Sequence, residues 1–395
     1  MASRYAFSTC RLEELCEINI GKTPSRSNPI FWNGTHPWLS IADMNQGRNL
    51  THTKERITAE GVVSSGIKEV TTGTLLLSYK LSIGKVGITQ KNLYTNEAIA
   101  ALPILDSSVL DINFLYWTLK TIDLLETSDK AAMGKTLNKA KLRQLQIPLP
   151  PLEEQKRIAG ILDAADILRA KRREALARLD DLLQSTFLDM FGDPVTNPKG
   201  WEVKTFGETV EKMHQGINTA ADKVRYVEVG APIIQAKHIV ADGISLEGVK
   251  FLGKSDREKY FSKYVPKQWD ILFSNIGTIG RSSIFTETKE LFFAWNVFGI
   301  RPNHTLVNVF YMKAFLDYLE TVNFFDRYLT GGTVKFVSKK VLGSIMLPLP
   351  PLELQRRFAE IVSSVEEQKA KMRKHLEQLD DLFASLQQRA FRGDL

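Results

Sequence analysis

The sequence predicts an α+β protein in which two similar globular domains are joined by two long helices that pair antiparallel as a coiled coil. Three observations predict this: an internal repeat, short apolar runs bounded by turn residues, and helical stripes with a spacing near 3.5 residues. We expect globular domains at 1–150 and 192–350, and helical regions at 151–191 and 351–395. The repeat implies that a pseudo-two-fold axis relates the two halves.

The repeat is clearest where each globular domain meets its helix. The segment Pro148–Glu153, with the sequence PLPPLE, recurs 200 residues later as Pro348–Glu353. The register then continues without a gap to the motif LDDL at Leu179–Leu182 and Leu379–Leu382. A period this long does not fit a solenoid, so we interpret the chain as two copies of a half-protein of about 200 residues.

The globular domains repeat more loosely. Leu75–Lys85 resembles Ile271–Arg281, and Asn96 precedes an apolar run just as Asn296 does. The apolar positions persist whereas the polar positions differ. This pattern indicates two domains that share a fold but bind different ligands or sequences.

Within one domain, strands and helices alternate irregularly. Leu75–Tyr79 and Ala98–Ile104 are short apolar runs bounded by Gly, Asn and Pro, so they predict strands. Helical spacing is present in two sets of residues: Leu115, Leu119, Ile122 and Leu125 in the first domain, and Phe310, Ala314, Tyr318 and Val322 in the second. Asn138 and Ser338 are suited to cap short helices just before the proline-rich segments.

The segments after the proline-rich hinges predict two long helices. Pro151 and Pro351 suit a first helical turn, because N–H groups in that turn make no hydrogen bond within the helix and a proline therefore removes none. Gly192 and Pro194 follow the first helix, as expected at a C-terminus. The residues predicted to form the helix–helix seam and partner contacts are Ile158, Ile161, Leu168, Leu179, Leu182, Phe358, Ile361, Val365, Leu379 and Leu382. We expect the two copies to pair with each other; pairing between different molecules is the alternative.

The charge is modest overall but unevenly placed. Lys and Arg total 52, Asp and Glu total 45, and the sequence pI is about 9.1. The two globular blocks each carry a net +4, whereas the helical regions carry −1 and 0. Two basic domains favour a polyanionic partner. No run of ~18 apolar residues is present, so no membrane span is predicted, and no apolar leader is found at the start of the sequence. The two cysteines, Cys10 and Cys16, are too few for a disulfide framework and lack the spacing of a metal site. Together these features predict a cytoplasmic protein.

Catalytic signatures are missing from the sequence. The Gly-Lys-Thr triplets at 21–23 and 134–136 lack the upstream Gly of a phosphate-binding loop. No adenine-methyltransferase loop is present, and the six histidines are scattered. Asp193 followed by Glu202 superficially resembles a metal-dependent nuclease core, but Asp193 lies at a helix end beside prolines. We predict a non-enzymatic protein with no catalytic or metal-binding residues. Two alternatives remain: a nuclease with a cryptic metal site, and a coiled-coil scaffold without affinity for nucleic acid.

Two copies of PLPPLE-x-Q, each followed by a helix with LDDL and preceded by an (L/F)S-x(4)-IG(K/R) turn, resemble a known family. It is the DNA-specificity subunit of type I restriction–modification systems. The helix exit Phe191-Gly192-Asp193-Pro194 is also typical of that family. The resemblance covers essentially the whole chain, and the paired proline-rich hinges are its most specific feature.

The resemblance implies that each globular block is a target recognition domain reading one half of a bipartite, asymmetric site in double-stranded DNA. The helices would set the spacing and hold two methyltransferase subunits. Those subunits would bring S-adenosylmethionine, and a restriction subunit with ATP and Mg²⁺ would be able to join. No cofactor is expected in this chain itself.

Positively charged and polar residues in loops are the candidate DNA contacts. Arginine and lysine suit phosphates and guanine, whereas asparagine suits adenine. The candidates in the first domain lie in a Gly/Pro/Ser-rich loop and in the turn after a strand: Lys22, Arg26, Lys80, Ser82 and Lys85. The candidates in the second domain are Lys237, His238, Asn275, Thr278, Arg281 and Lys335. We expect Gly84 and Gly280 to shape the turns.

Overall fold

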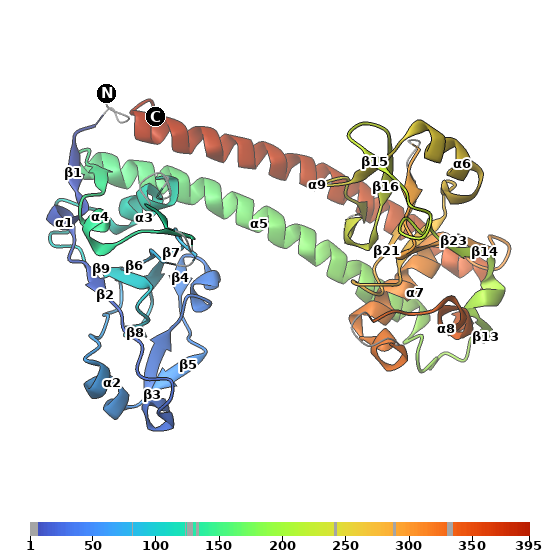
Figure 1. Ribbon diagram of the computed structural model, residues 1–395, viewed down its shortest axis with the longest axis horizontal. Coiled ribbons are helices and arrows are strands. Elements are labelled where there is room, and N and C mark those ends of the chain that lie inside the picture. Colours follow the sequence, from blue (N-terminus) through green and yellow to red (C-terminus); the bar gives the residue numbers. More distant parts are fainter. Residues whose placement is uncertain are drawn as a thin grey trace. The chain divides into compact units, whose positions relative to one another are not determined.

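The computed structural model describes residues 7–80, 82–122, 124, 129–131, 134–240, 243–286, 290–329 and 335–395. The chain divides into two compact units. Unit 1 comprises Met1–Arg173 and His375–Leu395, and unit 2 comprises Glu174–Lys374. Each unit therefore contains one globular domain and part of each long helix (Figure 1).

Unit 1 is built on two small sheets. The larger has the strand order β2-β9-β6-β7-β4, with β2 at Asn19–Ile20, β9 at Ile99–Leu102, β6 at Leu75–Ser78, β7 at Val86–Thr89 and β4 at Asn49–Leu50. The smaller has the order β5-β3-β8, with β5 at Glu55–Ile57, β3 at Trp32–Leu39 and β8 at Tyr94–Thr95. Two further pairs join β1 (Thr9–Arg11) to β12 (Gln146–Pro148) and β10 (Asp129–Ala131) to β11 (Gly134–Thr136). The strands predicted around 75–79 and 98–104 are thus β6 and β9.

Unit 2 has a similar topology, although each of its two main sheets has four strands. Its first sheet has the order β14-β23-β20-β21, with β14 at Val210–Gln215, β23 at Val297–Pro302, β20 at Ile271–Ser274 and β21 at Ser282–Ile284. Its second has the order β15-β19-β16-β22, with β15 at Tyr226–Val227, β19 at Lys250–Leu252, β16 at Ala231–Ile234 and β22 at Phe292–Phe293. The remaining pairs are β13 (Glu202–Thr205) with β24 (Met346–Leu349), and β17 (Ile239–Val240) with β18 (Gly243–Ile244).

Strand direction makes the correspondence between the units specific. In unit 1, β3 and β8 pair in parallel, and in unit 2 β16 and β22 do the same. The central antiparallel strands correspond as well, because β6 pairs with β7 and β9 just as β20 pairs with β21 and β23. The internal repeat predicted from the sequence is therefore confirmed at the level of the fold, including the loosely repeated globular domains.

Short helices surround these sheets. Unit 1 contains α1 (Leu12–Leu15), α2 (Ala59–Ser65), α3 (Ile112–Thr121) and α4 (Lys139–Arg143), and unit 2 contains α6 (Lys254–Tyr264), α7 (Val309–Thr321) and α8 (Lys339–Ser344). Both predicted caps are confirmed, because the side chains of Asn138 and Ser338 accept hydrogen bonds from backbone N–H groups at 2.9 and 3.2 Å. The predicted helix around Leu115 ends at Thr121, and Leu125 lies outside the described residues.

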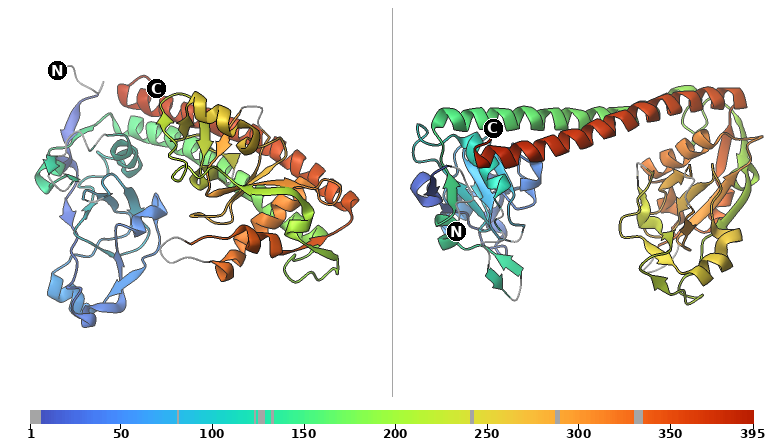
Figure 2. Two further views of the ribbon diagram at one scale, coloured as in Figure 1. Left: turned by 45° about the vertical axis from the view of Figure 1, so that its right-hand side comes forward. Right: turned by 90° about the horizontal axis from the view of Figure 1, so that it is seen from above.

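The long helices are α5 (Leu152–Phe191) and α9 (Leu352–Arg392). In each unit a segment of α5 runs beside a segment of α9 in the opposite direction (Figures 1 and 2). Arg169 Nε contacts Asp380 Oδ1 at 2.6 Å in unit 1, and Lys369 Nζ contacts Asp180 Oδ1 at 2.6 Å in unit 2. The antiparallel pairing of the two copies within one chain is confirmed. Among the helices of the described residues, no candidate for a membrane-spanning segment is found.

The two cross-helix ion pairs explain the repeated LDDL motif. Residues 169 and 369 are equivalent in the repeat, as are residues 180 and 380. The first aspartate of each motif therefore receives a cation from the other copy. The Lys369 side chain is only 5% exposed and lies at the helix–helix contact, where a regular coiled coil has apolar residues, whereas the Asp180 carboxylate that it contacts is 58% exposed.

The predicted seam needs correction at four positions. Ile158, Phe358 and Val365 are buried, and Ile161, Leu179 and Leu379 are partly buried. The predicted seam residues that instead face solvent are Leu168, Leu182, Ile361 and Leu382, at 55%, 48%, 38% and 50% exposed. The reason is that the helices bury their apolar residues against the globular domains as well as against each other, so the buried stripe departs from a regular heptad.

Aromatic residues join each domain to its helix pair. In unit 1, Phe114 of α3 lies 5.9 Å, between ring centroids, from Phe391 of α9. In unit 2, Tyr311 of α7 lies 4.8 Å from Phe191 of α5, and Phe191 in turn lies 5.4 Å from Phe358 of α9. Because these rings are largely or fully buried, each domain and its helix segments share one hydrophobic core.

Candidate nucleic-acid interface

Equivalent hairpin turns connect β6 to β7 and β20 to β21. The Ser78 hydroxyl donates a hydrogen bond to the carbonyl oxygen of Ser82, and the Ser274 hydroxyl donates one to that of Thr278. The turns close where Gly84 and Gly280 donate backbone hydrogen bonds to those serines, at 2.9 and 3.0 Å. Both glycines have positive φ, +90° and +101°, which other residues rarely adopt. The same hydrogen bonds thus hold both turns, although the side chains between them differ.

Lys22 and Lys80 lie on segments that meet in unit 1. The Lys22 N–H donates to the carbonyl oxygen of Thr95 at 2.8 Å, and its ammonium donates to that of Gly66 at 3.1 Å. Lys80 is exposed, with its Nζ 5.5 Å from the ring centroid of Tyr79. The Tyr79 hydroxyl donates to the carbonyl oxygen of Glu97, two residues along the chain from Thr95. The structure therefore brings the two predicted lysines to neighbouring segments.

The remaining candidates of unit 1 either contact other residues of this chain through their charged groups or are uncharged. The Lys85 ammonium donates to Asn45 Oδ1 at 2.7 Å and to the carbonyl oxygen of Ile41 at 3.3 Å. Arg26 forms an ion pair with Glu55. Ser82 is exposed in the hairpin turn. Among the cations predicted in this unit, Lys80 alone forms no hydrogen bond or ion pair with another described residue.

Four segments converge in unit 2. The Thr278 hydroxyl approaches the carbonyl oxygen of Ala236 at 3.5 Å, and Asn275 joins two other segments through its backbone. Its N–H donates to the carbonyl oxygen of Asn296 at 3.3 Å, and its own carbonyl oxygen accepts from the Val337 N–H at 3.0 Å. These contacts gather exposed side chains from all four segments: Lys237, Thr278, Trp295, Lys335 and Phe336.

The two aromatic residues of this surface were missed by the sequence reasoning. Trp295 and Phe336 are 44% and 36% exposed although both are large and apolar. Aromatic side chains beside cations are suited to nucleotides, because a base stacks on the ring while the cation faces a phosphate. Their position next to an apolar strand concealed them, since the sequence offers no means of distinguishing them from core residues.

His238 and Asn275 are placed differently from the surface positions that we expected. Both side chains are buried, at 2% and 1% exposed. His238 ends a 3₁₀ turn, η4 (Ala236–His238), and its Nδ1 accepts a hydrogen bond from the Gln235 N–H at 2.8 Å. In unit 1 Asp43 caps the equivalent turn, accepting from the Ser40 N–H at 2.9 Å. His238 therefore has a structural role, and burial lowers its pKa, with Lys237 acting in the same direction.

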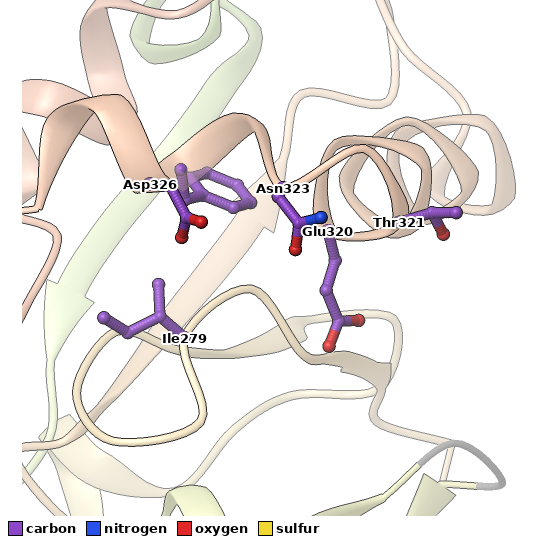
Figure 3. Close-up of a pocket in the computed structure, with 6 residues that line it drawn as sticks. Ile279, Glu320, Thr321, Asn323 and Asp326 are labelled. Carbon is purple, nitrogen blue, oxygen red and sulfur yellow. The ribbon is translucent and has the colours of Figure 1, made fainter. Parts of the chain in front are cut away.

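Arg281 contacts Glu320, one of the residues that line a pocket of about 400 Å³ in unit 2, and Figure 3 shows this lining. Arg281 Nε lies 3.8 Å from Glu320 Oε1, and Glu320 lines the pocket with Ile279, Thr321, Asn323, Phe325 and Asp326. Burial raises the pKa of Glu320, and the Asp317 carboxylate adds to this effect. An acidic lining does not attract DNA phosphates, so we do not include the pocket in the candidate phosphate-binding surface.

The described residues offer no metal centre. No group of three or more histidine, cysteine, aspartate or glutamate side chains among them is arranged to hold an ion. Asp193, the residue considered for a nuclease, accepts hydrogen bonds from the N–H groups of Val195 at 2.7 Å and Thr196 at 3.4 Å. Its carboxylate therefore organises the turn that follows α5.

Comparison with known proteins agrees with this architecture. The family described as "Type I restriction modification DNA specificity domain" matches the chain twice, at residues 6–178 and 198–380. The chain belongs to this family. The two matches follow the internal repeat and together cover most of the sequence, so the resemblance identified from the hinges and the LDDL motifs is confirmed.

Individual relatives of this specificity family are distant in sequence. The chain is 26% identical over 287 residues to the type I restriction enzyme MjaIX specificity subunit of Methanocaldococcus jannaschii, a match covering 68% of this chain and 65% of the relative. It is 24% identical over 397 residues to the MjaVIII specificity subunit of the same organism, covering 94% and 88%. The type I restriction–modification S subunit from M. genitalium, of known crystal structure, shares the fold with a TM-score of 0.56 at 17% identity, over 99% and 97% of the two chains.

Proposed function

We propose that this chain is the non-catalytic DNA specificity subunit of a type I restriction–modification complex. Each globular domain would read one half of a bipartite, asymmetric site in double-stranded DNA. The observation that carries the proposal is a pair of equivalent hairpin frames with unlike side chains. Lys80 and Ser82 in unit 1 correspond to Ile276 and Thr278 in unit 2, although Ser78 and Ser274 hold both turns in the same way. Equal frames with different chemistry suit two different half-sites.

The phosphate backbone would supply most of the affinity. Lys80 in unit 1 and Lys237 and Lys335 in unit 2 are exposed, and each lies next to a segment of the candidate surface. Contacts of this kind release counterions from DNA, so binding should weaken steeply as salt is added. The base sequence would be selected by a smaller number of side chains at base edges.

The exposed apolar residues of α5 and α9 support docking of other subunits. Leu168, Leu182, Ile361 and Leu382 lie on the long helices and are covered by neither globular domain in the described chain. Two methyltransferase subunits that hold S-adenosylmethionine and methylate adenine N6 would bind there. A restriction subunit with ATP and Mg²⁺ would join the same complex, inside the cell where the DNA is.

Reconstitution tests the proposal directly. The purified chain is mixed with its methyltransferase partner and S-adenosylmethionine, and methylated adenines are mapped on a random-sequence library. We expect sequence-dependent methylation that neither component gives alone. Methylation that is independent of this chain would remove the proposal. Mg²⁺-dependent cleavage by the pure chain, abolished by Asp193→Ala, would favour a nuclease, and failure to bind a duplex at low salt would favour a scaffold.

Exchange of one domain tests whether the two domains read DNA independently. Residues 201–345 are replaced by the corresponding block of another specificity subunit. We expect one half of the methylated site to change while the other half and the spacing stay the same. A change in both halves would contradict independent reading.

A further inference from the structure

Arg26 occupies a notch between two indole rings in unit 1. The rings of Trp32 and Trp38 meet edge to face, with centroids 5.1 Å apart and planes at 89°. The guanidinium carbon of Arg26 lies 3.8 Å from the ring centroid of Trp32 and 4.9 Å from that of Trp38. An arginine stacked this way gains cation–π attraction and loses freedom to rotate out of its plane.

The notch is held in place by the backbone. The indole N–H of Trp32 donates to the carbonyl oxygen of Ser25 at 3.1 Å, and that of Trp38 donates to the carbonyl oxygen of Lys22 at 3.0 Å. Both rings therefore anchor the loop that carries Arg26. This loop, residues 21–28, is also tied to the strand β8 by the hydrogen bond from Lys22 to Thr95. The site is preorganised before any ligand arrives.

Glu55 of β5 holds one edge of the guanidinium. Its carboxylate accepts hydrogen bonds from Nη1 and from Nη2, the latter at 3.0 Å. The Nε–H of Arg26 has no acceptor within the part of the chain that the structure describes. The side chain is 54% exposed. The guanidinium thus has one edge fixed by a carboxylate, one face covered by Trp32, and a second edge available.

We propose that Arg26 is a specificity-determining residue that reads guanine through the free edge containing Nε, and that Glu55 is its positioning residue. The inference rests on the proposed function and assigns a base class to one position of the site. Guanine offers two acceptors, O6 and N7, at the spacing of a guanidinium edge, and this bidentate contact is the commonest specific contact in the major groove.

The neighbouring carboxylate makes a base a better ligand than a phosphate. Arg26 and Glu55 together carry no net charge, so the pair attracts a polyanion little. A phosphate oxygen in contact with Arg26 would also be close to the Glu55 carboxylate and be repelled by it. The uncharged acceptors of guanine do not suffer this repulsion. Arg26 should therefore contribute to discrimination between bases much more than to overall affinity.

Unit 2 provides a matched control pair. Arg257 of α6 contacts Glu290 through Nε and Nη2, at 2.7 and 2.8 Å. Arg257 is also exposed, and its contact with Glu290 is also bidentate. It differs in that Nε itself is occupied, and no aromatic ring within the described residues stacks on Arg257. Loss of Arg257 should leave base preference unchanged.

The test uses the reconstituted complex with methyltransferase subunits and the random-sequence library. Wild-type chain should prefer guanine at one position of one half-site. Arg26→Ala and Arg26→Lys should reduce that preference at least about tenfold, since lysine keeps the charge but lacks the fork. Glu55→Ala should also weaken the preference, while raising non-specific duplex affinity and steepening its salt dependence by about one counterion. Arg257→Ala should change neither quantity.

The outcomes separate this inference from the proposed function. If Arg26→Lys retains the full guanine preference, or if Arg26→Ala weakens binding to all sequences equally, Arg26 is a phosphate or structural residue and the inference is wrong. In that case sequence-dependent methylation by the wild-type complex still upholds the specificity function. If the wild-type complex shows no sequence preference at all, the proposed function itself fails. Circular dichroism of each variant shows whether the domain remains folded. If Arg26→Ala does not fold, the guanine preference of Arg26→Lys tests the inference.

Discussion

The side-chain oxygen of Gln155 accepts a hydrogen bond from the backbone N–H of Asp111 at 2.9 Å. Gln155 lies near the start of α5, and Asp111 caps the N-terminus of α3. The repeat reproduces this contact in unit 2, where Gln355 accepts from the N–H of Asn308 at 2.8 Å. Both glutamines are fully buried and also donate to the carbonyl oxygen of the proline at position 150 or 350. The glutamine of the PLPPLE-x-Q motif thus connects each domain to its long helix.

Replacing either glutamine by leucine should destabilise the corresponding unit. Leucine fills similar volume, but the Asp111 N–H and the Pro150 carbonyl oxygen would lose their partner in a buried place, at a cost of about 1–3 kcal/mol for each unsatisfied group. We expect Gln155→Leu and Gln355→Leu to lower the midpoint of thermal unfolding. Gln184→Leu, on an exposed part of α5, is the control and should change it little. An unchanged midpoint for both motif variants would contradict the role of the hydrogen bonds.

Gly21 and Gly216 should not tolerate a side chain. A Cβ atom on Gly21 would lie 2.2 Å from the carbonyl oxygens of Thr95 and Asn96, and one on Gly216 would lie 2.2 Å from that of Phe293. Backbone atoms cannot move aside as a flexible side chain does, so alanine at either position should cost several kcal/mol and expose the unit to proteolysis. Gly160 is the opposite case. It lies in α5 with no atom within 4 Å of its Cβ position, so Gly160→Ala should stabilise the helix by about 1 kcal/mol.

His238 should make unit 2 sensitive to acid. Because burial lowers its pKa below the usual 6.5, the unfolded chain binds a proton more readily than the folded one. The stability that neutral His238 contributes is complete above pH 6.5 and is lost as the pH falls below that value. Asparagine at this position keeps an acceptor for the Gln235 N–H but does not titrate. Unfolding of His238→Asn in urea should therefore depend less on pH between 5 and 7 than that of the wild type. An identical dependence would show that the pKa of His238 is the same in the folded and the unfolded chain.

The exposed lysines of the candidate surface should control the salt dependence of DNA binding. Each phosphate contact removed should reduce the slope of log affinity against log salt by about 0.9, without changing which sequences bind best. We expect this of Lys80→Ala in unit 1 and Lys335→Ala in unit 2, measured by titration of a duplex at several salt concentrations. Lys171→Ala, at an exposed position on α5, is the matched control. If Lys171 has the larger effect, DNA contacts the helices and not the hairpin surfaces.

The exposed leucines of the long helices should affect assembly and not folding. Leu182 and Leu382 are equivalent in the repeat and are 48% and 50% exposed. Replacing both by serine should leave thermal unfolding nearly unchanged but weaken binding of the methyltransferase subunits, as measured by analytical ultracentrifugation. Val365→Ser is the contrasting variant. Because Val365 is buried, this substitution should lower the midpoint of thermal unfolding. Normal assembly of the double-serine variant would place the docking surface elsewhere.

The sequence predicted the architecture well because a long ungapped repeat is a strong signal. The hinges, the LDDL motifs and the caps Asn138 and Ser338 all lie where the pattern placed them. The seam was predicted less well. A spacing near 3.5 residues shows that a helix has an apolar stripe, but the sequence does not show what covers each position. Leu168 and Leu182 fit the pattern and are exposed, whereas Lys369 breaks it and is buried.

The candidate interface shows the same division. From residue type alone, His238 and Arg26 both looked like polar loop residues available to DNA. In the structure His238 is buried and caps a turn, whereas Arg26 is exposed and packs against Trp32 and Glu55. Whether a polar loop residue is available to contact DNA therefore depends on neighbours that are distant in the chain. Trp295 and Phe336 are exposed, and this too could not be predicted, because the sequence does not show whether an aromatic side chain is buried or exposed.

The sequence by itself determined the twofold repeat, the α+β class, the two long helices and the family, because these depend on periodic patterns and motifs within continuous stretches of chain. The tertiary structure alone decided which cations are already paired, which polar residues are buried and which apolar residues remain uncovered. Those properties depend on contacts such as Arg26 with Glu55 and Asp180 with Lys369, which join residues 29 and 189 positions apart. Electrostatic and burial energies act through space, so local sequence does not contain them.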